Sequence, residues 1–435
     1  MPKKLKLLSI ILLINSMALA QAPLLTPEVA LQKALEHNFR IRIEKNTSQT
    51  SAIGNSWSAA GLWPQITAQS QTGIASNDLE QRLANGTNIK RNDAILRNMA
   101  AGLTINWRIF NGMQMFATKK RLEELELIGE LNFKRQVTIT SYEVLTAYYE
   151  IVQLKQQITA LRETLNYLEE RKKIAEDRFR IGTSPKTDLL QAQVDHNLQR
   201  ANLLTLENNL QLAKTQFNHL LGQKPTTPFE VVAAPEPGTS PDYAGYQSQL
   251  LSKNFDLLVA QSQMMVLFQQ KRELALQRLP VVTLNGNLNY NRNRNDAGFN
   301  LFSSNFGPSG SIGVSIPLFN GGALNRELKV AELQIQQQKI TIEELQNRLE
   351  TGLLNAYTQY RYAQELATIE TMNLELIREN LQIATERFRK LSITSLELRQ
   401  IQLDYMNCRS RLLSAQYLAK LAETEMKLLV GDVTL

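Results

Sequence analysis

The sequence contains two copies of one pattern, separated by a constant spacing. Phe110-Asn111-Gly112 recurs as Phe319-Asn320-Gly321, and Arg178-Phe179-Arg180 recurs as Arg387-Phe388-Arg389, each 209 positions later (319 − 110 and 387 − 178). Further matches at this spacing are Ala147-Tyr148 with Ala356-Tyr357, Asp195 with Asp404, and Gly222 with Gly431. A repeat this regular predicts two copies of one structural unit, and the chain must fold both.

The spacing is larger near the start of each copy. Asn38-Phe39 recurs as Asn254-Phe255, and Pro64 recurs as Pro280, a shift of 216 (280 − 64). The first copy therefore has 7 extra residues (216 − 209) between its Pro and its Phe-Asn-Gly. Loops tolerate such insertions, so a loop of variable length is expected there.

The N-terminus has the pattern of a cleaved signal peptide. Three lysines precede an apolar stretch at residues 7–14, and Ala18-Leu19-Ala20 supplies small residues for a peptidase. The stretch is too short for a bilayer span, which takes ~20 apolar residues. We expect residues 1–20 to be removed.

No Cys follows the cleavage site, and the one Cys, Cys408, lies in a helical pattern, so neither a lipid anchor nor an internal disulfide is expected.

Composition limits the class of membrane protein. The hydrophobic content is 43%, and after the signal no run of 18 apolar residues occurs, which is too little for a polytopic helical protein. Any membrane span must therefore consist of strands. The net charge of +7 is dispersed over both copies, which favours solvated helix faces over a nucleic-acid site.

The sequence gives no support to an enzyme. It has no Gly-rich phosphate loop and no HExxH motif, and its three His residues, His37, His196 and His219, lack metal-ligand spacing. We expect no catalytic residues, no metal and no cofactor.

Long helices with heptad seams are predicted in both copies. Apolar residues alternate in steps of four and three from Leu154 to Phe179, interrupted by Lys172, and a second seam runs from Leu203 to Leu220. Between Gly112 and Arg180 there is no Pro, so one helix of about 70 residues would reach roughly 100 Å. Such lengths indicate coiled-coil packing.

Four segments alternate with the period of a strand, at about residues 64–75, 99–110, 280–291 and 310–319. In the third, Val282, Leu284 and Leu288 share one face, opposite Asn285 and Asn287. One apolar face and one uncharged polar face fit a barrel with lipid outside and water inside. The alternative is a soluble hairpin half-buried against a core. The segments between paired strands are residues 76–98 and 293–308, and the family resemblance described below implies that they face outside the cell.

The strand count predicts an oligomer. Two hairpins give four strands per chain, whereas the smallest barrels need about 8 and a lipid-facing sheet cannot leave an open edge. Two, three or four identical chains could close the barrel.

Several motifs at the ends of these elements carry a family resemblance. They are Pro317-Leu318-Phe319-Asn320-Gly321-Gly322, Arg178-Phe179-Arg180-Ile181-Gly182-Thr183 and Thr187-Asp188-Leu189-Leu190-Gln191-Ala192. With the twofold repeat and the signal peptide, they resemble the TolC-type outer-membrane efflux proteins over about residues 24–432. The resemblance implies a homotrimer in which 12 strands form one outer-membrane barrel and 12 helices form a periplasmic tunnel. It also implies a periplasmic adaptor and an inner-membrane pump as partners, and a passive exit duct as the function.

The resemblance also implies where function is concentrated. The helix breaks form the periplasmic tip, which meets the adaptor and closes the aperture; its candidate residues are Gly182, Thr183, Asp188, Leu391, Ser392 and Glu397. The strand-to-helix junctions are Phe110, Asn111, Gly112, Phe319, Asn320 and Gly321. The alternative for the two acids is structural, because Thr394 to Glu397 reads as a capping box and Asp188 lies near a helix N-terminus.

The second helix break departs from the family pattern. Leu391 stands where Gly often occurs, Ile393 stands where a basic residue often occurs, and Phe388 replaces an aromatic hydroxyl. A closed state must therefore use other contacts, and Arg389, Lys390 and Arg399 are the candidates.

The predicted domains are a first repeat at residues 21–223, a Pro-rich linker at 224–246 and a second repeat at 247–435. The linker has too many prolines for a helix or a central strand. It is either part of a belt around the tunnel, as the resemblance implies, or a disordered connector. Two alternative functions stay open: the outlet of a protein-secretion system with the same fold, and a periplasmic coiled-coil tether or adaptor without a pore.

Overall fold

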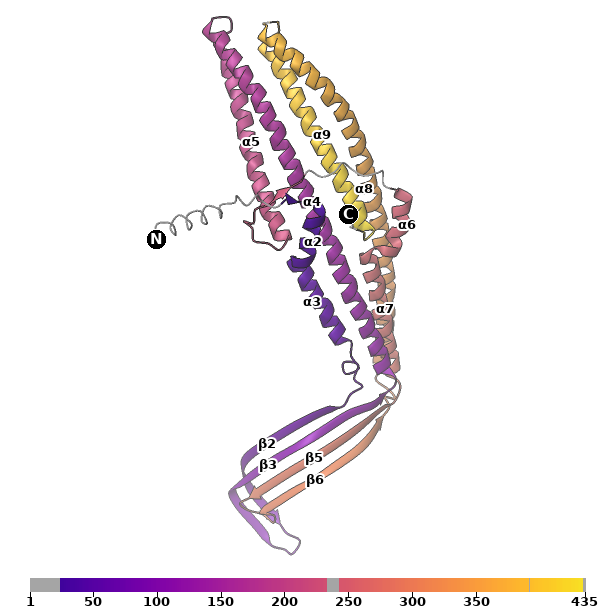
Figure 1. Ribbon diagram of the computed structural model, residues 1–435. Helices are drawn as coiled ribbons and strands as arrows, with labels where there is room; N and C mark the ends of the chain where they lie inside the picture. Colours follow the sequence, from indigo (N-terminus) through magenta and orange to yellow (C-terminus); the bar gives the residue numbers. More distant parts are fainter. Residues whose placement is uncertain (1–23, 233–241, 391, 433–435) are drawn as a thin grey trace, which may run out of the picture. The chain divides into compact units, whose positions relative to one another are not determined.

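The two long helices of each copy have the same lengths as their matches in the other copy, as the duplication predicts. In this computed structural model, α4 (Gln114–Arg180) and α8 (Ala323–Arg389) have 67 residues each, and α5 (Lys186–Leu220) and α9 (Ser395–Leu429) have 35 each (Figure 1). The shorter helices also correspond: α2 (Pro27–His37) with α6 (Tyr243–Lys253), and α3 (Phe39–Gly54) with α7 (Phe255–Leu276). The duplication and the long helices are confirmed.

The structure describes residues 24–232, 242–390 and 392–432. The expected signal peptide, part of the Pro-rich linker and Leu391 lie outside the described residues. The chain divides into two units. Unit 1 consists of the described residues within Met1–Asn46, Asn132–Leu258 and Glu344–Leu435, and unit 2 consists of Thr47–Leu131 and Val259–Glu343. Among the described helices, none combines the length and the apolar character that a bilayer crossing requires.

Unit 2 contains a four-stranded antiparallel sheet in the order β2-β3-β5-β6. Its strands are β2 (Gln65–Arg82), β3 (Asn88–Asn111), β5 (Val281–Asn295) and β6 (Phe302–Ser315). The register places apolar residues opposite one another, as in Leu284 paired with both Trp107 and Ile312. Uncharged polar residues form the alternate rows, as in Asn287 paired with Thr104 and Ser309. The predicted alternation of faces is therefore present in the sheet.

The strand ends differ from the expected ones. The first hairpin continues well beyond residues 64–75 and 99–110, so that residues 83–87, rather than 76–98, connect its strands. The second hairpin also extends its expected segments, to Asn295 and back from Phe302. Backbone pairing does not need an apolar face, so these polar extensions lack the alternation that marks a strand. In contrast, β6 ends at Ser315 rather than 319, close to Pro317, which cannot donate a backbone hydrogen bond.

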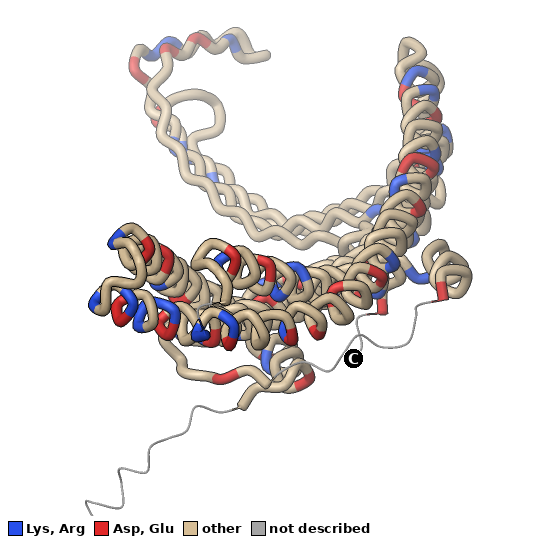
Figure 2. The backbone as a smooth tube through the Cα atoms, turned by 90° about the horizontal axis from the view of Figure 1, so that it is seen from above, with Lys and Arg blue, Asp and Glu red and all other residues tan. Residues whose placement is uncertain are grey.

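Charged residues of both signs are interspersed along the long helices (Figure 2). This distribution agrees with the dispersed charge of the sequence. The middle of the sheet carries few charges in the same view (Figure 2).

Unit 1 begins with a small parallel sheet of β1 (Leu24–Leu25) and β4 (Glu230–Val231). The interval 224–246, predicted as a linker or a belt segment, contains β4 and the first residues of α6. A strand of two residues and the first turn of a helix fit between the prolines of this interval. The prolines are therefore compatible with both elements.

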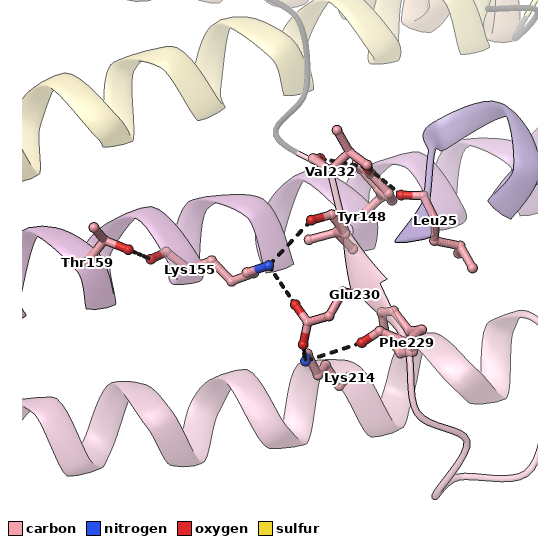
Figure 3. Close-up of polar contacts among 9 residues, drawn as sticks. Leu25, Tyr148, Lys155, Thr159, Lys214, Phe229, Glu230 and Val232 are labelled. Carbon is pink, nitrogen blue, oxygen red and sulfur yellow. Dashed lines mark hydrogen bonds and ion pairs between the residues drawn. The ribbon is translucent and has the colours of Figure 1, made fainter. Parts of the chain in front are cut away.

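Two side chains fasten the small sheet to the long helices (Figure 3). Glu230 receives hydrogen bonds from Lys155 Nζ of α4 at 2.6 Å and from Lys214 Nζ of α5 at 2.8 Å. These bonds hold the pKa of Glu230 below its usual value. Tyr148 Oη lies 2.9 Å from Leu25 O and 2.7 Å from Val232 O. Burial raises the pKa of Tyr148 to about 12, so the hydroxyl keeps its proton.

The repeated Asn residues perform the same task in each copy of unit 1. Asn38 donates from Nδ2 to Leu220 O at 2.7 Å, and its Oδ1 accepts from the backbone N of Ile41 at 3.2 Å. Asn254 donates in the same way to Leu429 O at 2.9 Å. Each Asn thus joins the start of one helix to the end of another and is almost fully buried.

Candidate functional site

The first helix break is a tight turn between α4 and α5. Gly182 has φ +77°, a conformation that favours glycine. The backbone N of Thr183 donates to Arg178 O at 2.9 Å, which closes the end of α4. Asp188 lies in the first turn of α5 and accepts a 2.7 Å hydrogen bond from Ser184 Oγ. Gly182, Thr183 and Asp188 therefore lie close together in one turn, on the outer end of the hairpin (Figure 1).

The second helix break, between α8 and α9, uses the equivalent bond. The backbone N of Ser392 donates to Arg387 O at 2.8 Å, at the positions that match Thr183 and Arg178. Thr394 and Glu397 form the predicted capping box, with Glu397 N to Thr394 Oγ1 and Thr394 N to Glu397 Oε2 both at 3.2 Å. The helix-start role of Glu397 is confirmed.

The ends of the two hairpins contact each other. The guanidinium of Arg178, on α4, lies 3.9 Å from the ring centre of Phe388 on α8 and donates to the Phe388 carbonyl. Arg389 of α8 forms an ion pair with Glu170 of α4. Phe388, which stands where the family often has an aromatic hydroxyl, is 1% exposed. Its ring therefore joins the hairpins by packing and by the cation–π contact with Arg178.

A second set of contacts lies farther from the turns, around Asp195 of α5. Its Oδ2 accepts from Arg171 Nη1 at 3.0 Å and from Arg399 Nε of α9 at 2.9 Å. Its Oδ1 accepts from Gln191 at 2.8 Å. Asp195 thus bridges the two hairpins, because Arg171 lies on α4 and Arg399 on α9.

Arg171 is 2% exposed and is the largest fully buried side chain of the described residues. Burial lowers its pKa, and the neighbouring Asp195 carboxylate offsets part of that effect. A buried guanidinium without its carboxylate is costly, by about 3–5 kcal/mol when one partner of a buried pair is removed. The Asp195 contacts therefore fix how the hairpins pack.

A cluster of apolar side chains also lies between the hairpins. Its buried members are Leu381, Ala384, Phe388, Leu398 and Tyr405. Tyr167 and Ile174 of α4 pack against it, and the rings of Tyr167 and Tyr405 meet edge to face at 6.3 Å between centroids. The interface between the hairpins thus contains both apolar packing and the hydrogen-bonded charges around Asp195. Satisfied polar groups in such an interface favour one arrangement of the hairpins.

The strand-to-helix junctions in unit 2 differ between the copies. Asn111 Oδ1 accepts from the backbone N of Met115 at 3.1 Å, and a side chain at Gly112, with φ +65°, would lie 2.8 Å from Leu276 O. Gly321 has the same φ but nothing near it. Phe319 is 89% exposed, whereas its match Phe110 is partly buried. The repeated motif therefore has packed surroundings only in the first copy.

Comparison with known proteins identifies the family. The family model described as "Outer membrane efflux protein" matches residues 30–223 and 247–432. The chain belongs to this family. Solved outer membrane efflux structures share the fold at low identity. The outer-membrane channel OprN is 16% identical with a TM-score of 0.77, over 93% of this chain and 89% of that chain.

Two further solved structures are similar over the same share of this chain. The outer membrane protein VceC from Vibrio cholerae is 18% identical with a TM-score of 0.74, over 93% of this chain and 96% of that one. The MtrE outer membrane channel of Neisseria gonorrhoeae, in its open state, is 15% identical with a TM-score of 0.70, over 93% and 89%. No curated protein matches the sequence.

Family membership establishes the general function. As an outer membrane efflux protein, the chain acts in transport, as the exit duct of an efflux system, rather than in a family of enzymes. The resemblance to TolC-type proteins is confirmed, and the efflux channel is favoured over a periplasmic tether without a pore.

The structure brings together only some of the predicted tip residues. Gly182, Thr183 and Asp188 share one turn, and Ser392 and Glu397 lie at the other. In the described part of the chain, no hydrogen bond or ion pair joins Asp188 to Glu397. Arg389 and Arg399, two of the three candidates for contacts that hold a closed state, form ion pairs with Glu170 and Asp195 of the first copy. Sequence reasoning missed Arg171 and Glu170. The sequence signal that could have indicated Arg171 is its position next to Lys172, where a charged residue interrupts the apolar heptad seam.

Proposed function

We propose that three copies of the chain close one outer-membrane barrel, continued by a periplasmic tunnel of helices, which docks to an adaptor and an inner-membrane pump and passively conducts substrate outward. Four strands per chain and three chains give the 12 strands that the family resemblance implies. The open edges of the sheet support this assembly. Among the described residues, β2 and β6 each pair with one neighbouring strand only. An unpaired edge in lipid leaves backbone groups without hydrogen bonds.

The side chains of the sheet also support a barrel. Ile66 of β2 and Ile312 of β6 are 67% and 70% exposed, on the apolar face that the register defines. The opposite face carries Thr, Ser, Asn and Gln. A sheet with this pair of faces suits lipid on one side and a water-filled lumen on the other.

The helices of unit 1 support a ring of chains. Leu376 and Ile383 of α8 are 67% and 52% exposed. Their matches in the first copy, Tyr167 and Ile174 of α4, pack against the second copy. In a ring, the second copy of one chain meets the first copy of the next, so Leu376 and Ile383 would gain the cover that their matches already have.

The helix breaks are proposed as the tip of the tunnel. There Gly182, Thr183, Asp188, Leu391, Ser392 and Glu397 would meet the adaptor, and the acids would also help to start their helices. Asp195, with Arg171 and Arg399, would hold the hairpins of each chain in the closed arrangement. The bridge between Arg399 and Asp195 at 2.9 Å is the observation on which this proposal depends most.

Planar-bilayer conductance of the purified protein tests the duct and its closure together. Arg399→Gln removes one of the two ion pairs of Asp195 and leaves no buried charge unpaired, because Asp195 keeps its ion pair with the buried Arg171. We expect a higher open probability than in the wild type. Asp177→Asn is the matched control, because Asp177 pairs with Arg180 within the same hairpin; it should behave as the wild type.

Two results would contradict the proposal. Absence of any current from the wild type and from Arg399→Gln, with or without the adaptor, would reject the duct. Equal open probability for Arg399→Gln, Asp177→Asn and the wild type would reject closure by Asp195 while leaving the duct in place.

A further inference from the structure

An arginine in the interface between the hairpins has a buried nitrogen atom without a hydrogen-bond partner among the described residues. Arg409 lies on α9, and its Nε atom is buried without a hydrogen-bond partner among the described residues. Buried polar atoms are nearly always paired. An arginine whose buried Nε lacks a partner among the described residues is therefore a candidate for binding a ligand.

Arg409 lies between two cavities of unit 1. The first has a volume of about 410 Å³ and is lined by side chains of α4, β4 and α9; these are Val152, Lys155, Gln156, Thr159, Val231, Arg409, Leu412, Leu413 and Gln416. The second has a volume of about 390 Å³ and is bounded by α4, α5 and α9. Arg409 and Leu413 line both cavities. Volumes of this size fall within the range of small-molecule sites, ~300–1,000 Å³.

The lining has the chemistry of a site for an organic anion. The first cavity combines apolar Val152, Val231 and Leu412 with two cations, Lys155 and Arg409. Among the described residues, neither cavity is lined by Asp or Glu. Lys155 already forms an ion pair with Glu230 beside the cavity (Figure 3). Arg409 is therefore the better candidate of the two cations for binding an anion. Gln156 and Thr159 offer further polar groups next to it.

We propose that Arg409 binds the carboxylate or sulfonate of a small amphiphilic anion, whose apolar part occupies the adjoining cavity. The cavities are too small for a helix, which has a diameter of ~10–12 Å with its side chains. A small molecule thus fits better than a partner's helix. The site lies beside the contact of β4 with α4 and α5, away from the helix breaks, and it does not depend on whether the pore conducts.

The duplication supplies a matched control. Arg200 of α5 is the repeat equivalent of Arg409 (409 − 209) and is exposed rather than set between cavities. The two arginines have the same charge and comparable places in their helices. Arg409→Gln and Arg200→Gln each lower the net charge by one. Only Arg409→Gln removes a cation that lines the cavities.

The test is fluorine NMR on the full-length protein in a neutral detergent, with para-trifluoromethylbenzoate as the probe and the uncharged amide, para-trifluoromethylbenzamide, as its isostere. We expect the wild type and Arg200→Gln to bind the benzoate more tightly than the amide. We expect Arg409→Gln to lose affinity for the benzoate by about tenfold, the size of one charge-assisted hydrogen bond. Circular dichroism and the oligomeric mass of each variant establish that it is folded.

Three results would overturn the proposal. They are no binding of the benzoate to the folded wild type, equal binding of benzoate and amide, and equal loss of affinity in Arg409→Gln and Arg200→Gln. If the wild type binds no probe but Arg409→Gln alone weakens binding of the adaptor, Arg409 serves an acidic partner protein and the small-anion site is rejected.

Discussion

Asn38 and Asn254 show how a repeated residue in the sequence acquires a structural role. Each was recognised only as a repeat, yet each joins two helix ends with both its donor and its acceptor. The capping box at Thr394 and Glu397 could be predicted outright, because both partners are three residues apart. The partners of Asp195 could not, because Arg399 lies 204 residues away in the sequence and only packing brings it close.

Replacement of Asn38 by Ala should destabilise the protein. The change removes the cap of α3 and leaves Leu220 O without its donor, so we expect a loss of about 1–3 kcal/mol. Thermal unfolding followed by circular dichroism measures it. Asn254→Ala, at the equivalent position, should lose a similar amount. Unfolding temperatures unchanged in both variants would contradict the structural role.

Glu370 should make stability depend on pH. The residue is 5% exposed, and hydrogen bonds from Arg411 hold the pKa of its carboxyl below the usual value of 4.5. A lowered native pKa stabilises the fold above about pH 4.5, and this stabilisation is lost as the pH falls through the native pKa. Glu370→Gln should therefore unfold at a lower temperature than the wild type at pH 7, with a smaller difference at pH 3.

The control for that prediction is Glu375→Gln, at an exposed position of the same helix. It should follow the wild type at both pH values. A difference between Glu370→Gln and the wild type that is the same at pH 7 and pH 3 would show that the charge of Glu370 is not responsible.

At the scale of elements, sequence signals defined helices better than strands. The absence of Pro between Gly112 and Arg180 predicted one long helix, and α4 has 67 residues. The sequence also predicted the helix break at Gly182, which lies between α4 and α5. The strands run beyond their predicted ends because backbone hydrogen bonds continue where the side chains on both faces are polar. The small sheet of β1 and β4 left no pattern, since each strand has only two residues.

Two glycines at helix ends should respond differently to Ala. Both have positive φ, +77° at Gly182 and +66° at Gly222. A Cβ at Gly182 meets nothing within 4 Å, whereas one at Gly222 would overlap the His37 carbonyl. Gly182→Ala should cost only the left-handed conformation, about 1–2 kcal/mol. Gly222→Ala should cost clearly more, because the backbone must also move.

Thermal unfolding of the two variants measures this difference. A Gly222→Ala protein as stable as Gly182→Ala would mean that the close approach of α2 to the end of α5 is not present in solution.

At the scale of the whole molecule, the repeat predicted the duplicated helices and the four strands of one sheet. It did not determine the number of chains. Four strands per chain require several copies, but two, three and four all satisfy the closure argument. The proposed number of three rests on the family resemblance, and the exposed Leu376 and Ile383 support the proposal that another chain covers them.

The most direct test of the account is native mass spectrometry of the mature protein after extraction of the outer membrane with a mild detergent. We expect an assembly of three chains that stays in solution only with detergent. A single chain that remains dissolved after the detergent is removed would contradict it.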